Sequence, residues 1–267
     1  MKAKDIALLN PPSIEKSQPL SRALKLMEET GAYCVIVRES GIPYGLISYK
    51  DILNKVSTAR FRKIHVLSIR LSSFFNPITN KVTEDASIAD AAALVLNSPS
   101  CCCPVYSGEQ LIGIVYPKLF LKAVSKSTEV VVAQVMRSIK ESSLKTSDRI
   151  IHARKILAEQ KAFAAPVLTE DGKVFGVLDE RDLVKAYVGF LTHVPEKHQK
   201  AQINYLLISD VCKKTSHVVY EGDYLNIAAK IMLEEDLSGL PASNETGDLV
   251  GFLGLKEVLN FISLSFK

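Results

Sequence analysis

A nine-residue phrase recurs four times along this chain, and the recurrence restricts the possible folds more than any other feature. Each copy has a glycine, a short apolar run and a basic residue five positions after the glycine. The copies are "GLISYKDIL" (45–53), "GIVYPKLFL" (113–121), "GVLDERDLV" (176–184) and "GFLGLKEVL" (251–259). A second landmark, an alanine after a short apolar-periodic start, keeps the same register at Ala23, Ala91, Ala153 and Ala228. Because the two landmarks agree within one residue, we interpret the chain as four repeats of one structural unit.

The order of elements is the same in every repeat. A short extended piece comes first, around Ile14, Val82, Leu144 or Val219, and an amphipathic helix follows it. Two apolar runs then flank a turn that contains Gly41, Gly108, Gly172 or Gly247, which is the pattern of a β-hairpin. The recurring phrase ends the second strand of that hairpin and begins a second helix. We therefore predict an α/β (α+β) fold made of four β-α-β-β-α repeats.

One repeat of about 55 residues is close to the lower limit for burying its own core, so we expect the repeats to pack in pairs. The first pair is predicted over residues 1–125, with repeats at about 4–56 and 71–124. The second pair is predicted over residues 130–267, with repeats at about 132–187 and 208–262. The segment between the pairs is short, and its composition places the boundary only to within several residues.

Composition excludes several classes of protein. The 267 residues are 47% apolar and carry a net charge of only +4, which does not favour a nucleic-acid-binding protein. No apolar run approaches the roughly 20 residues that span a bilayer, and the amino terminus does not read as a secretory signal, so we expect a cytoplasmic protein without a membrane partner. No constellation of catalytic residues can be identified, so we expect no enzymatic activity.

Two segments suggest other chemistry, and we favour a structural interpretation of each. The five cysteines, three of them adjacent at Cys101, Cys102 and Cys103, fit reduced, buried small residues better than disulfides, a metal site or a reactive thiol. The basic segment 60–70 could bind nucleic acid weakly, yet a connector helix with one solvated basic face explains it better.

The repeats resemble the cystathionine β-synthase (CBS) domain family over nearly the whole chain. The resemblance rests on the order of elements, on a proline before the hairpin (Pro104, Pro166 and Pro241), and on the terminal phrase Gly-x-x-Ser/Thr-x-x-Asp. The first repeat departs from the pattern at the proline, where we align Val35. The resemblance implies four CBS repeats in two Bateman modules, which bind a regulatory adenosine compound such as AMP, ADP, ATP or S-adenosylmethionine in the cleft between paired repeats.

In this family the terminal acid binds the ribose hydroxyls, and the hydroxyl residue three positions earlier lies near the ribose or phosphate. The first repeat, with Ser48 and Asp51, therefore carries the best predicted site. The third repeat keeps Asp182 but has Asp179 in place of serine, and the fourth has Gly254 and the longer acid Glu257, so both are predicted to bind more weakly. In the second repeat, Tyr116 and Leu119 provide no ribose acceptor.

Further positions are implied by the same resemblance. A base precedes each acid position, at Lys50, Lys118, Arg181 and Lys256; it could contact a phosphate, although we favour a solvated residue in the first helical turn. The base pocket is expected near Ala32 and Tyr33, with Cys101, Phe163 and Ser238 at the matching positions. The residues before the first strand, which also line the pocket in relatives, are Pro12, Asn80, Ser142 and His217.

Ser48 and Asp51 also fit a helix-capping box, and this role is compatible with ligand binding because a carboxylate has lone pairs to spare. The leading hypothesis is a regulatory sensor that requires no cofactor, binds an adenine nucleotide and signals to an unidentified effector protein, with self-association expected. The alternative is a protein-interaction scaffold whose ligand clefts have degenerated. The sequence does not distinguish which nucleotide binds or how many clefts are filled.

Overall fold

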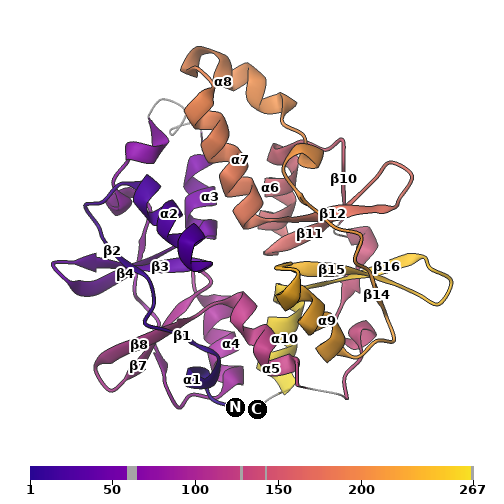
Figure 1. The fold of residues 1–267 in the computed structure, drawn as a ribbon, viewed down its shortest axis with the longest axis horizontal. Coiled ribbons are helices and arrows are strands. Elements are labelled where there is room, and N and C mark those ends of the chain that lie inside the picture. The colour runs from indigo at the N-terminus through magenta and orange to yellow at the C-terminus, as the bar shows by residue number, and fades with distance from the viewer. Residues whose placement is uncertain (59–64, 127–128, 142, 266–267) are drawn as a thin grey trace. The chain divides into compact units, whose positions relative to one another are not determined.

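The computed structural model of the protein describes residues 1–58, 65–126, 129–141 and 143–265 (Figure 1). Within these residues each repeat has the predicted order of elements. The first repeat comprises β2 (Ser13–Glu15), α2 (Leu20–Thr30), β3 (Cys34–Glu39), β4 (Ile42–Ser48) and α3 (Tyr49–Val56). The second comprises β6 (Val82–Thr83), α4 (Ile88–Asn97), β7 (Cys103–Ser107), β8 (Gln110–Val115) and α5 (Leu121–Val124). The third comprises β10 (Leu144–Lys145), α6 (Ile150–Glu159), β11 (Ala164–Leu168), β12 (Val174–Asp179) and α7 (Glu180–His193). The fourth comprises β14 (Val219–Tyr220), α9 (Leu225–Glu234), β15 (Gly239–Ser243), β16 (Leu249–Gly254) and α10 (Leu255–Ser265).

The predicted hairpin turns have the backbone that glycine permits. Gly41, Gly108, Gly172 and Gly247 all have positive φ, between 57° and 87°. The first helix of the first repeat buries Leu20, Ala23 and Met27 on one face and ends at Gly31, which has a φ of 65°. These features confirm the predicted mixed α/β fold with repeated β-α-β-β-α units.

Each repeat has a four-stranded sheet, and its fourth strand comes from outside the repeat. These strands are only two residues long: β1 (Leu8–Leu9), β5 (Asn76–Pro77), β9 (Arg137–Ser138) and β13 (Lys213–Lys214). The segment before the second repeat, β5, joins the sheet of the first, and the segment before the first repeat, β1, joins the sheet of the second. Strands β13 and β9 make the same reciprocal exchange between the third and fourth repeats. The exchange links the repeats into two pairs.

The fourth strand explains the glycine of the recurring phrase. Gly45 pairs with Pro77 of β5, and a Cβ at Gly45 would lie 2.7 Å from the carbonyl oxygen of Asn76. The equivalent Gly113 would place a Cβ 3.0 Å from the carbonyl oxygen of Leu8. At Gly176 the clash would be with the carbonyl oxygen of Lys213, and at Gly251 with the side chain of Met136. A side chain at this position would therefore push the fourth strand away from the sheet.

The chain divides into two compact units. Unit 1 contains residues 1–119, 184–200 and 263–267, and unit 2 contains residues 120–183 and 201–262. The second half of α7, from Val184, thus belongs to unit 1, and so do the first five residues of α8 (Glu196–Gln202). In unit 1 the sheets of the first two repeats share an apolar cluster that includes Ile36, Leu46 and Ile114. The predicted boundaries of the two pairs, 1–125 and 130–267, stay a prediction.

Two details differ from the sequence-based expectation. The second repeat begins its terminal helix with a 3-10 turn at Pro117–Phe120, and its first residue is a proline where the other repeats have a residue with an N–H group. The expected connector helix over 60–70 falls partly on residues 59–64, which lie outside the described residues. Beyond them, Val66–Ser68 forms a 3-10 turn, and Arg70 bridges to Pro19.

The strand registers also correct the alignment of the first repeat by one residue. Ser48 pairs with Cys34, whereas the equivalent Asp179 pairs with Ala164. Pro166 lies two residues after Ala164, so its counterpart in the first repeat is Ile36 rather than Val35. The error arose because the first repeat lacks the proline that fixes the alignment elsewhere.

Candidate functional site

The terminal phrase of the first repeat forms a buried capping box at the start of α3. The Oγ atom of Ser48 accepts a hydrogen bond from the backbone N–H of Asp51 at 3.2 Å. In return, Oδ2 of Asp51 accepts from the backbone N–H and the hydroxyl of Ser48, at 2.9 and 2.8 Å. Both residues are nearly inaccessible, at 0% and 4% exposed. The capping interpretation of "SYKD" is therefore confirmed, and the carboxylate is held rigidly at the helix N-terminus.

The other oxygen of Asp51 faces two residues outside the phrase. Nδ2 of Asn76, in β5, donates to Oδ1 at 2.6 Å and also to the hydroxyl oxygen of Ser100 at 3.1 Å. Ser100, in the second repeat, is 1% exposed and also hydrogen bonds to the carboxylate. Burial raises the pKa of Asp51 above its usual 3.8, and the hydrogen bonds from Ser100 and Ser48 oppose the rise. The carboxylate therefore lies within a polar network that joins both repeats of the first pair.

Three tyrosines lie near this network. The ring of Tyr33 packs edge-on against Tyr49 at 6.0 Å between centroids and is stacked on Tyr116 at 6.2 Å. Tyr33 precedes β3, Tyr49 is the first residue of α3, and Tyr116 follows β8 in the second repeat. The stacking of Tyr33 on Tyr116 therefore connects the two repeats of the first pair.

The register places Tyr33, rather than Ala32, at the position that matches Phe163 and Ser238. The carbonyl oxygen of Tyr33 accepts from the backbone N–H of Tyr49 at 3.3 Å. The carbonyl oxygens of Phe163 and Ser238 accept from the residues equivalent to Tyr49, each at 3.2 Å. Ala32 is 1% exposed and belongs to the core, so its alignment with the base-pocket position was wrong by one residue.

In the fourth repeat the terminal acid is paired with an arginine from the fourth strand. Nη1 of Arg137, in β9, lies 3.2 Å from Oε1 of Glu257, and the two side chains are 14% and 9% exposed. The guanidinium also donates to the carbonyl oxygen of Ala164 at 2.8 Å and lies 5.1 Å from the ring centroid of Phe252. Oε2 of Glu257 accepts from the backbone N–H of Gly254 at 3.2 Å, which is one of the two hydrogen bonds of a capping box. The acid is therefore engaged with a cation.

In the third repeat Asp179 replaces the capping serine, and the guanidinium of Arg181 lies beside it. Its Oδ1 accepts from the backbone N–H of Asp182 at 2.9 Å, and its Oδ2 accepts from the hydroxyl of Ser238 at 2.8 Å. Nη2 of Arg181 lies 3.4 Å from Oδ2 of Asp179, and Nη1 of Arg181 lies 2.8 Å from Oδ2 of Asp236. The arginine that we considered as a phosphate ligand thus bridges two carboxylates of unit 2.

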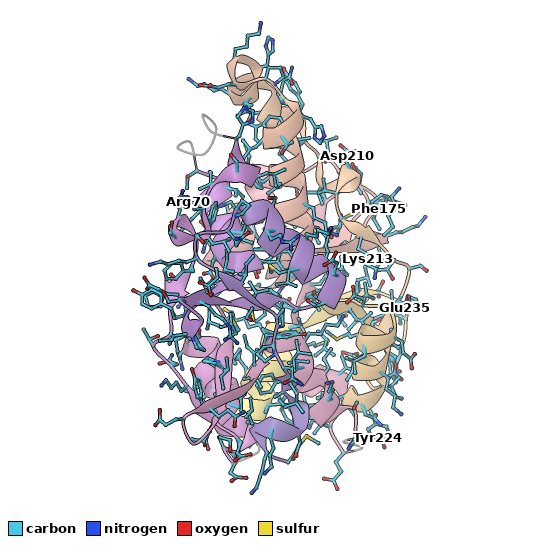
Figure 2. All side chains as sticks on the ribbon, turned by 60° about the vertical axis from the view of Figure 1, so that its left-hand side comes forward. Arg70, Phe175, Asp210, Lys213, Tyr224 and Glu235 are labelled. Carbon is cyan, nitrogen blue, oxygen red and sulfur yellow. The ribbon has the colours of Figure 1, made fainter. Side chains whose placement is uncertain are left out.

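One residue of each fourth strand is equivalent to Asn76, and its chemical type varies with the residue at the acid position of the terminal phrase. Asn76 faces Asp51, and Arg137 faces Glu257. In the second repeat, where Leu119 replaces the acid, the equivalent fourth-strand residue is Leu8, and both belong to one apolar cluster. In the third repeat the equivalent residue is Lys213, whose Nζ instead donates to the carbonyl oxygens of Glu235 and Asp236. Lys213 and Glu235 are labelled in Figure 2. These fourth-strand residues were not predicted as part of the site.

The basic residues that precede the acids are not simply solvated, contrary to the interpretation we favoured. Nζ of Lys50 donates to Sγ of Cys101 at 3.0 Å, and Nζ of Lys256 donates to the carbonyl oxygen of Gln160. With the bond from Arg181 to Asp236, three of the four bases reach the turn after the first helix of the paired repeat. Each of these three side chains therefore bonds one repeat to the other repeat of its pair, and each is only partly exposed.

The residues predicted before the first strands lie in different settings. The carbonyl oxygen of Pro12 accepts from the backbone N–H of Ile36 at 2.9 Å, which ties it to β3. His217 is exposed and its Nδ1 lies 3.1 Å from the hydroxyl of Thr215. Ser142 lies outside the described residues. The structure thus brings the predicted site residues together in two groups. The group in unit 1 also includes three residues that were not predicted as ligand contacts of the first repeat, and it consists of Tyr33, Ser48, Lys50, Asp51, Asn76, Ser100 and Cys101. The group in unit 2 surrounds Asp179 and consists of Arg181, Asp182 and Ser238.

The cysteines are buried, as expected for small core residues. All five cysteines are free and buried, and burial raises the pKa of Cys103 to about 12. Among the residues that the structure describes, no group of three or more histidine, cysteine or acidic side chains could hold a metal ion. No helix in that part of the chain has the length and apolar character to cross a membrane.

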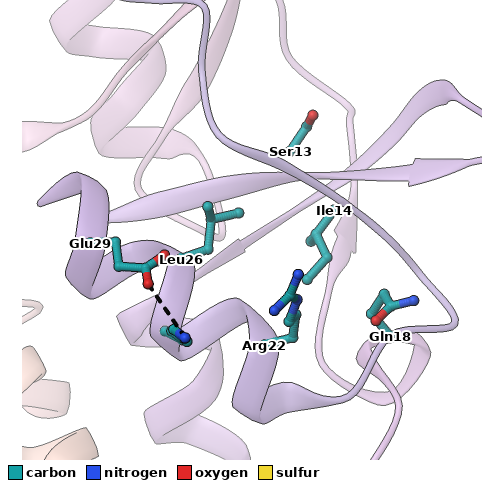
Figure 3. A pocket seen from close by; sticks show the side chains of 7 residues that line it. Ser13, Ile14, Gln18, Arg22, Leu26 and Glu29 are labelled. Atoms are coloured by element: carbon teal, nitrogen blue, oxygen red, sulfur yellow. Dashed lines mark ion pairs between the residues drawn. The ribbon is translucent and has the colours of Figure 1, made fainter.

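Unit 1 also contains a polar pocket of about 370 Å³ between β2 and α2 (Figure 3). Its lining residues are Ser13, Ile14, Gln18, Arg22, Lys25, Leu26 and Glu29, none of which was predicted as a site residue. Lys25 and Glu29 form an ion pair at 3.6 Å on its helical wall. We interpret this pocket as a solvated surface depression, because its charged side chains are exposed and all lie on α2.

The comparison with protein families identifies the chain as a member of the CBS domain family. The family matches residues 3–58, 132–189 and 208–264, which correspond to the first, third and fourth repeats. Residues 71–124 lie outside the matched segments, although they have the same order of elements and the same exchanged strand. The unmatched repeat is the one that has Tyr116 and Leu119 in place of the serine or threonine and the acid of the terminal phrase.

Two solved structures are similar in fold over 98% of this chain. Protein MJ1225 of Methanocaldococcus jannaschii, described as a proposed archaeal homologue of g-AMPK, matches with a TM-score of 0.75. The match covers 98% of this chain and 99% of that one at 18% identity. An uncharacterised conserved protein of Pyrococcus horikoshii matches with a TM-score of 0.60 and 19% identity, over 98% of this chain and 100% of that one.

Curated relatives match shorter parts of the chain. The anion/proton exchange transporter GEF1 of Saccharomyces cerevisiae is 37% identical over 62 residues, which are 23% of this chain and 8% of the transporter. The uncharacterised protein MJ1426 of Methanocaldococcus jannaschii is 26% identical over 126 residues, which are 39% of this chain and 75% of that protein.

Proposed function

We propose that the protein is a non-catalytic regulatory sensor that binds an adenosine compound, such as AMP, ADP, ATP or S-adenosylmethionine, in the cleft between its first two repeats. One observation carries the proposal: a buried carboxylate, Asp51, is fixed by Ser48 at a helix N-terminus and faces Asn76 and Ser100 across the repeat boundary. A buried, pre-oriented acceptor of this kind is suited to a pair of ribose hydroxyls.

The ligand would take over hydrogen bonds that the protein now makes internally. Asn76 and Ser100 donate to the carboxylate of Asp51, and two ribose hydroxyls are chemically equivalent donors. The tyrosine rings of Tyr33 and Tyr116 provide the adjacent aromatic surface for a purine base. Lys50 and the helix N-terminus of α3 supply positive charge on the side where a phosphate would lie.

The remaining clefts are weaker candidates for physical reasons. Glu257 is already neutralised by Arg137, so a ribose would have to displace a charge-assisted bond. Asp179 and Asp182 place two carboxylates together, which disfavours a phosphate even with Arg181 nearby. In the second repeat Leu119 offers no acceptor. We therefore propose one principal site.

Calorimetric titration of the full chain with AMP, ADP, ATP, S-adenosylmethionine and GTP tests the proposal. We expect one adenosine compound to bind saturably, GTP to bind more weakly, and Asp51→Ala to lose at least about tenfold in affinity. Glu257→Ala is the matched control, since it removes the equivalent acid from another cleft of the chain. Binding that is lost in Glu257→Ala and retained in Asp51→Ala would move the site to the second pair.

The alternative function is a scaffold that binds an effector protein without a small ligand. Two observations favour it: Leu119, at the acid position of the second repeat, lies in an apolar cluster with Leu8, and Glu257 is already paired with Arg137. If no compound in the panel binds protein that is shown to be folded, the scaffold becomes the better account. In either case we propose that the output is a change in how the protein associates with an effector or with a second copy of itself.

A further inference from the structure

The guanidinium of Arg137 joins the third and fourth repeats inside unit 2. Arg137 belongs to the two-residue strand β9, which pairs with β16 of the fourth repeat. Its Nη1 lies 3.2 Å from Oε1 of Glu257 in the fourth repeat. Its Nη2 donates to the carbonyl oxygen of Ala164, in the third repeat, at 2.8 Å. All three residues belong to unit 2, so one side chain engages acceptors from both repeats of the second pair.

The surroundings of this guanidinium have the features of a binding site for a planar cation. Its central carbon lies 5.1 Å from the ring centroid of Phe252, and the face of an aromatic ring attracts a cation. Phe252 and Ala164 belong to one buried apolar cluster with Val177. The side chains of Arg137 and Glu257 are almost wholly buried. The position thus offers a carboxylate, a carbonyl oxygen and an aromatic face in a largely apolar setting.

The first pair carries a neutral residue at the equivalent position. There β5 provides Asn76, whose side-chain amide donates to Asp51. Other neutral donors, such as ribose hydroxyls, can replace an amide donor without changing the charge of the site. A guanidinium forms charge-assisted hydrogen bonds, which neutral hydroxyls do not match. The two pairs therefore differ in whether the terminal acid is held by an exchangeable neutral donor or by a cation of the chain.

We propose that the second pair contains a site for a small guanidinium cation and that Arg137 occupies this site as an internal ligand. The contacts with Glu257, Ala164 and Phe252 are those that a free alkylguanidinium would make. Only the covalent link to β9 distinguishes the side chain from such a molecule. Because the chain supplies its own ligand, the third and fourth repeats are bridged without any molecule from solution. This site is separate from Asp51 and does not depend on it.

The internal ligand has a consequence for regulation, and this consequence alone rests on the proposed function. An adenosine compound at Asp51 bridges the first pair only while it is bound, whereas Arg137 bridges the second pair at all times. A ligand shifts an arrangement only where it binds one state better than another. The first pair is therefore the part of the molecule that responds, and the second pair is held in one bridged arrangement.

Calorimetric titration of the full-length Arg137→Ala variant with ethylguanidinium chloride, without nucleotide, tests the site. Ethylguanidinium replaces the atoms that the substitution removes, and we expect it to bind saturably in the millimolar range. Propylammonium has the same charge without the planar fork and should bind at least about tenfold more weakly. The unmodified protein should bind neither cation saturably, because Arg137 fills the site.

Two further variants serve as controls for this titration. Arg22→Ala removes an exposed arginine of α2 and should give no saturable binding of ethylguanidinium. The double variant Arg137→Ala with Glu257→Gln keeps the space but removes the charge of the acid, and it should bind at least about tenfold more weakly than Arg137→Ala alone.

An NMR measurement on the unmodified protein removes any dependence on folding of the variants. The Nη–H signals of Arg137 should be resolved from one another, because the bonds to Glu257 and Ala164 stop rotation of the guanidinium, whereas those of the exposed Arg22 should be averaged. The proposal is overturned if the Arg137 signals are also averaged, if folded Arg137→Ala gives no saturable heat with ethylguanidinium, or if propylammonium binds as tightly. If ethylguanidinium binds as expected while adenosine compounds do not bind the unmodified protein, the internal ligand stands and only its consequence for regulation fails.

Discussion

At the scale of single residues, Asp51 combines burial with four hydrogen-bond donors. The backbone N–H and hydroxyl of Ser48, the amide of Asn76 and the hydroxyl of Ser100 together match the lone pairs that a carboxylate offers. Such a network is costly to leave incomplete, because an unpaired buried acceptor loses its hydration without compensation. A ligand at this carboxylate must therefore supply donors as good as those it displaces.

The raised pKa of Asp51 predicts a pH-dependent stability. Since burial raises the pKa of this carboxyl in the folded protein, the folded state binds the proton more tightly than the unfolded chain. The contribution of this group to stability is then largest at low pH and falls as pH rises from 3.8 through the raised pKa. The asparagine side chain in the Asp51→Asn variant does not titrate, so this variant lacks the contribution of the carboxyl group. We expect the free energy of unfolding of the unmodified protein, measured with urea, to fall relative to that of Asp51→Asn as the pH rises above 3.8. Parallel curves for the two proteins would contradict the assignment.

The glycine of the recurring phrase provides a second prediction at this scale. A Cβ at Gly176 would press on the backbone carbonyl of Lys213, which cannot move without breaking the pairing of β12 with β13. We expect Gly176→Ala to lower the free energy of unfolding by about 1–3 kcal/mol.

The control is Gly189→Ala, in the open position of α7, which should raise the free energy of unfolding by up to about 1 kcal/mol. Urea unfolding of both variants checks the pair. Equal stability of Gly176→Ala and the unmodified protein would mean that the fourth strand does not need the glycine.

At the scale of elements, the exchanged two-residue strands decide which residues meet the terminal acid. Strand β5 brings Asn76 to Asp51, and β9 brings Arg137 to Glu257. Because each fourth strand precedes the other repeat of its pair, both repeats must be in place before either acid is satisfied. The strand exchange therefore makes the pair, rather than the single repeat, the unit that carries the site.

The Arg137–Glu257 pair tests this role of the fourth strand. Arg137→Leu leaves the nearly buried carboxylate of Glu257 without its cation, and we expect a loss of about 2–4 kcal/mol in the free energy of unfolding. The double substitution Arg137→Leu with Glu257→Leu places leucines at the positions that Leu8 and Leu119 occupy in the second repeat, and it should recover most of that loss. Urea unfolding of the single and double variants gives the answer. If the double variant is less stable than the single one, the four positions are not equivalent.

Much of this organisation could be predicted from the sequence, because helices and hairpins leave periodic apolar patterns and glycines at turns. The fourth strands could not, since two residues are too few to show a period. The partners Asn76 and Arg137 were missed for the same reason. A signal existed: Leu8, Asn76 and Lys213 each lie six residues before the first strand's apolar residue, and Arg137 lies seven before it. That spacing becomes meaningful only after the strand exchange is known.

The error at Ala32 has a different cause. A hairpin register is fixed by a landmark on each strand, and the first repeat has the glycine of the phrase but not the proline. We interpreted the basic residues before the acids as solvated, and this was wrong for Lys50, Arg181 and Lys256. A solvated basic residue and one that bonds to a distant turn have the same local sequence. Long-range contacts of this kind leave no periodic signal.

At the scale of the whole molecule, four copies of one unit have kept the fold and diverged at the acid. The first pair contains Ser48 with Asp51 in one repeat and the apolar Leu119 at the acid position of the other. In the second pair, Glu257 is paired with Arg137, and the carboxylate of Asp182 accepts from the backbone N–H of Asp179. A regulatory protein needs only one cleft whose ligand prefers one arrangement of the molecule. We therefore expect one ligand per chain rather than four.

The most direct test of this account compares AMP with 2′-deoxy-AMP, or the same pair of analogues of whichever adenosine compound binds most tightly, on the unmodified protein and on Asp51→Ala. If Asp51 holds the ribose hydroxyls, the unmodified protein should bind the ribose form at least about tenfold more tightly, and Asp51→Ala should bind both forms with nearly equal, weak affinity. An unmodified protein that does not distinguish the two forms, or an Asp51→Ala variant that keeps the full preference, would show that Asp51 caps its helix and does not recognise a ribose.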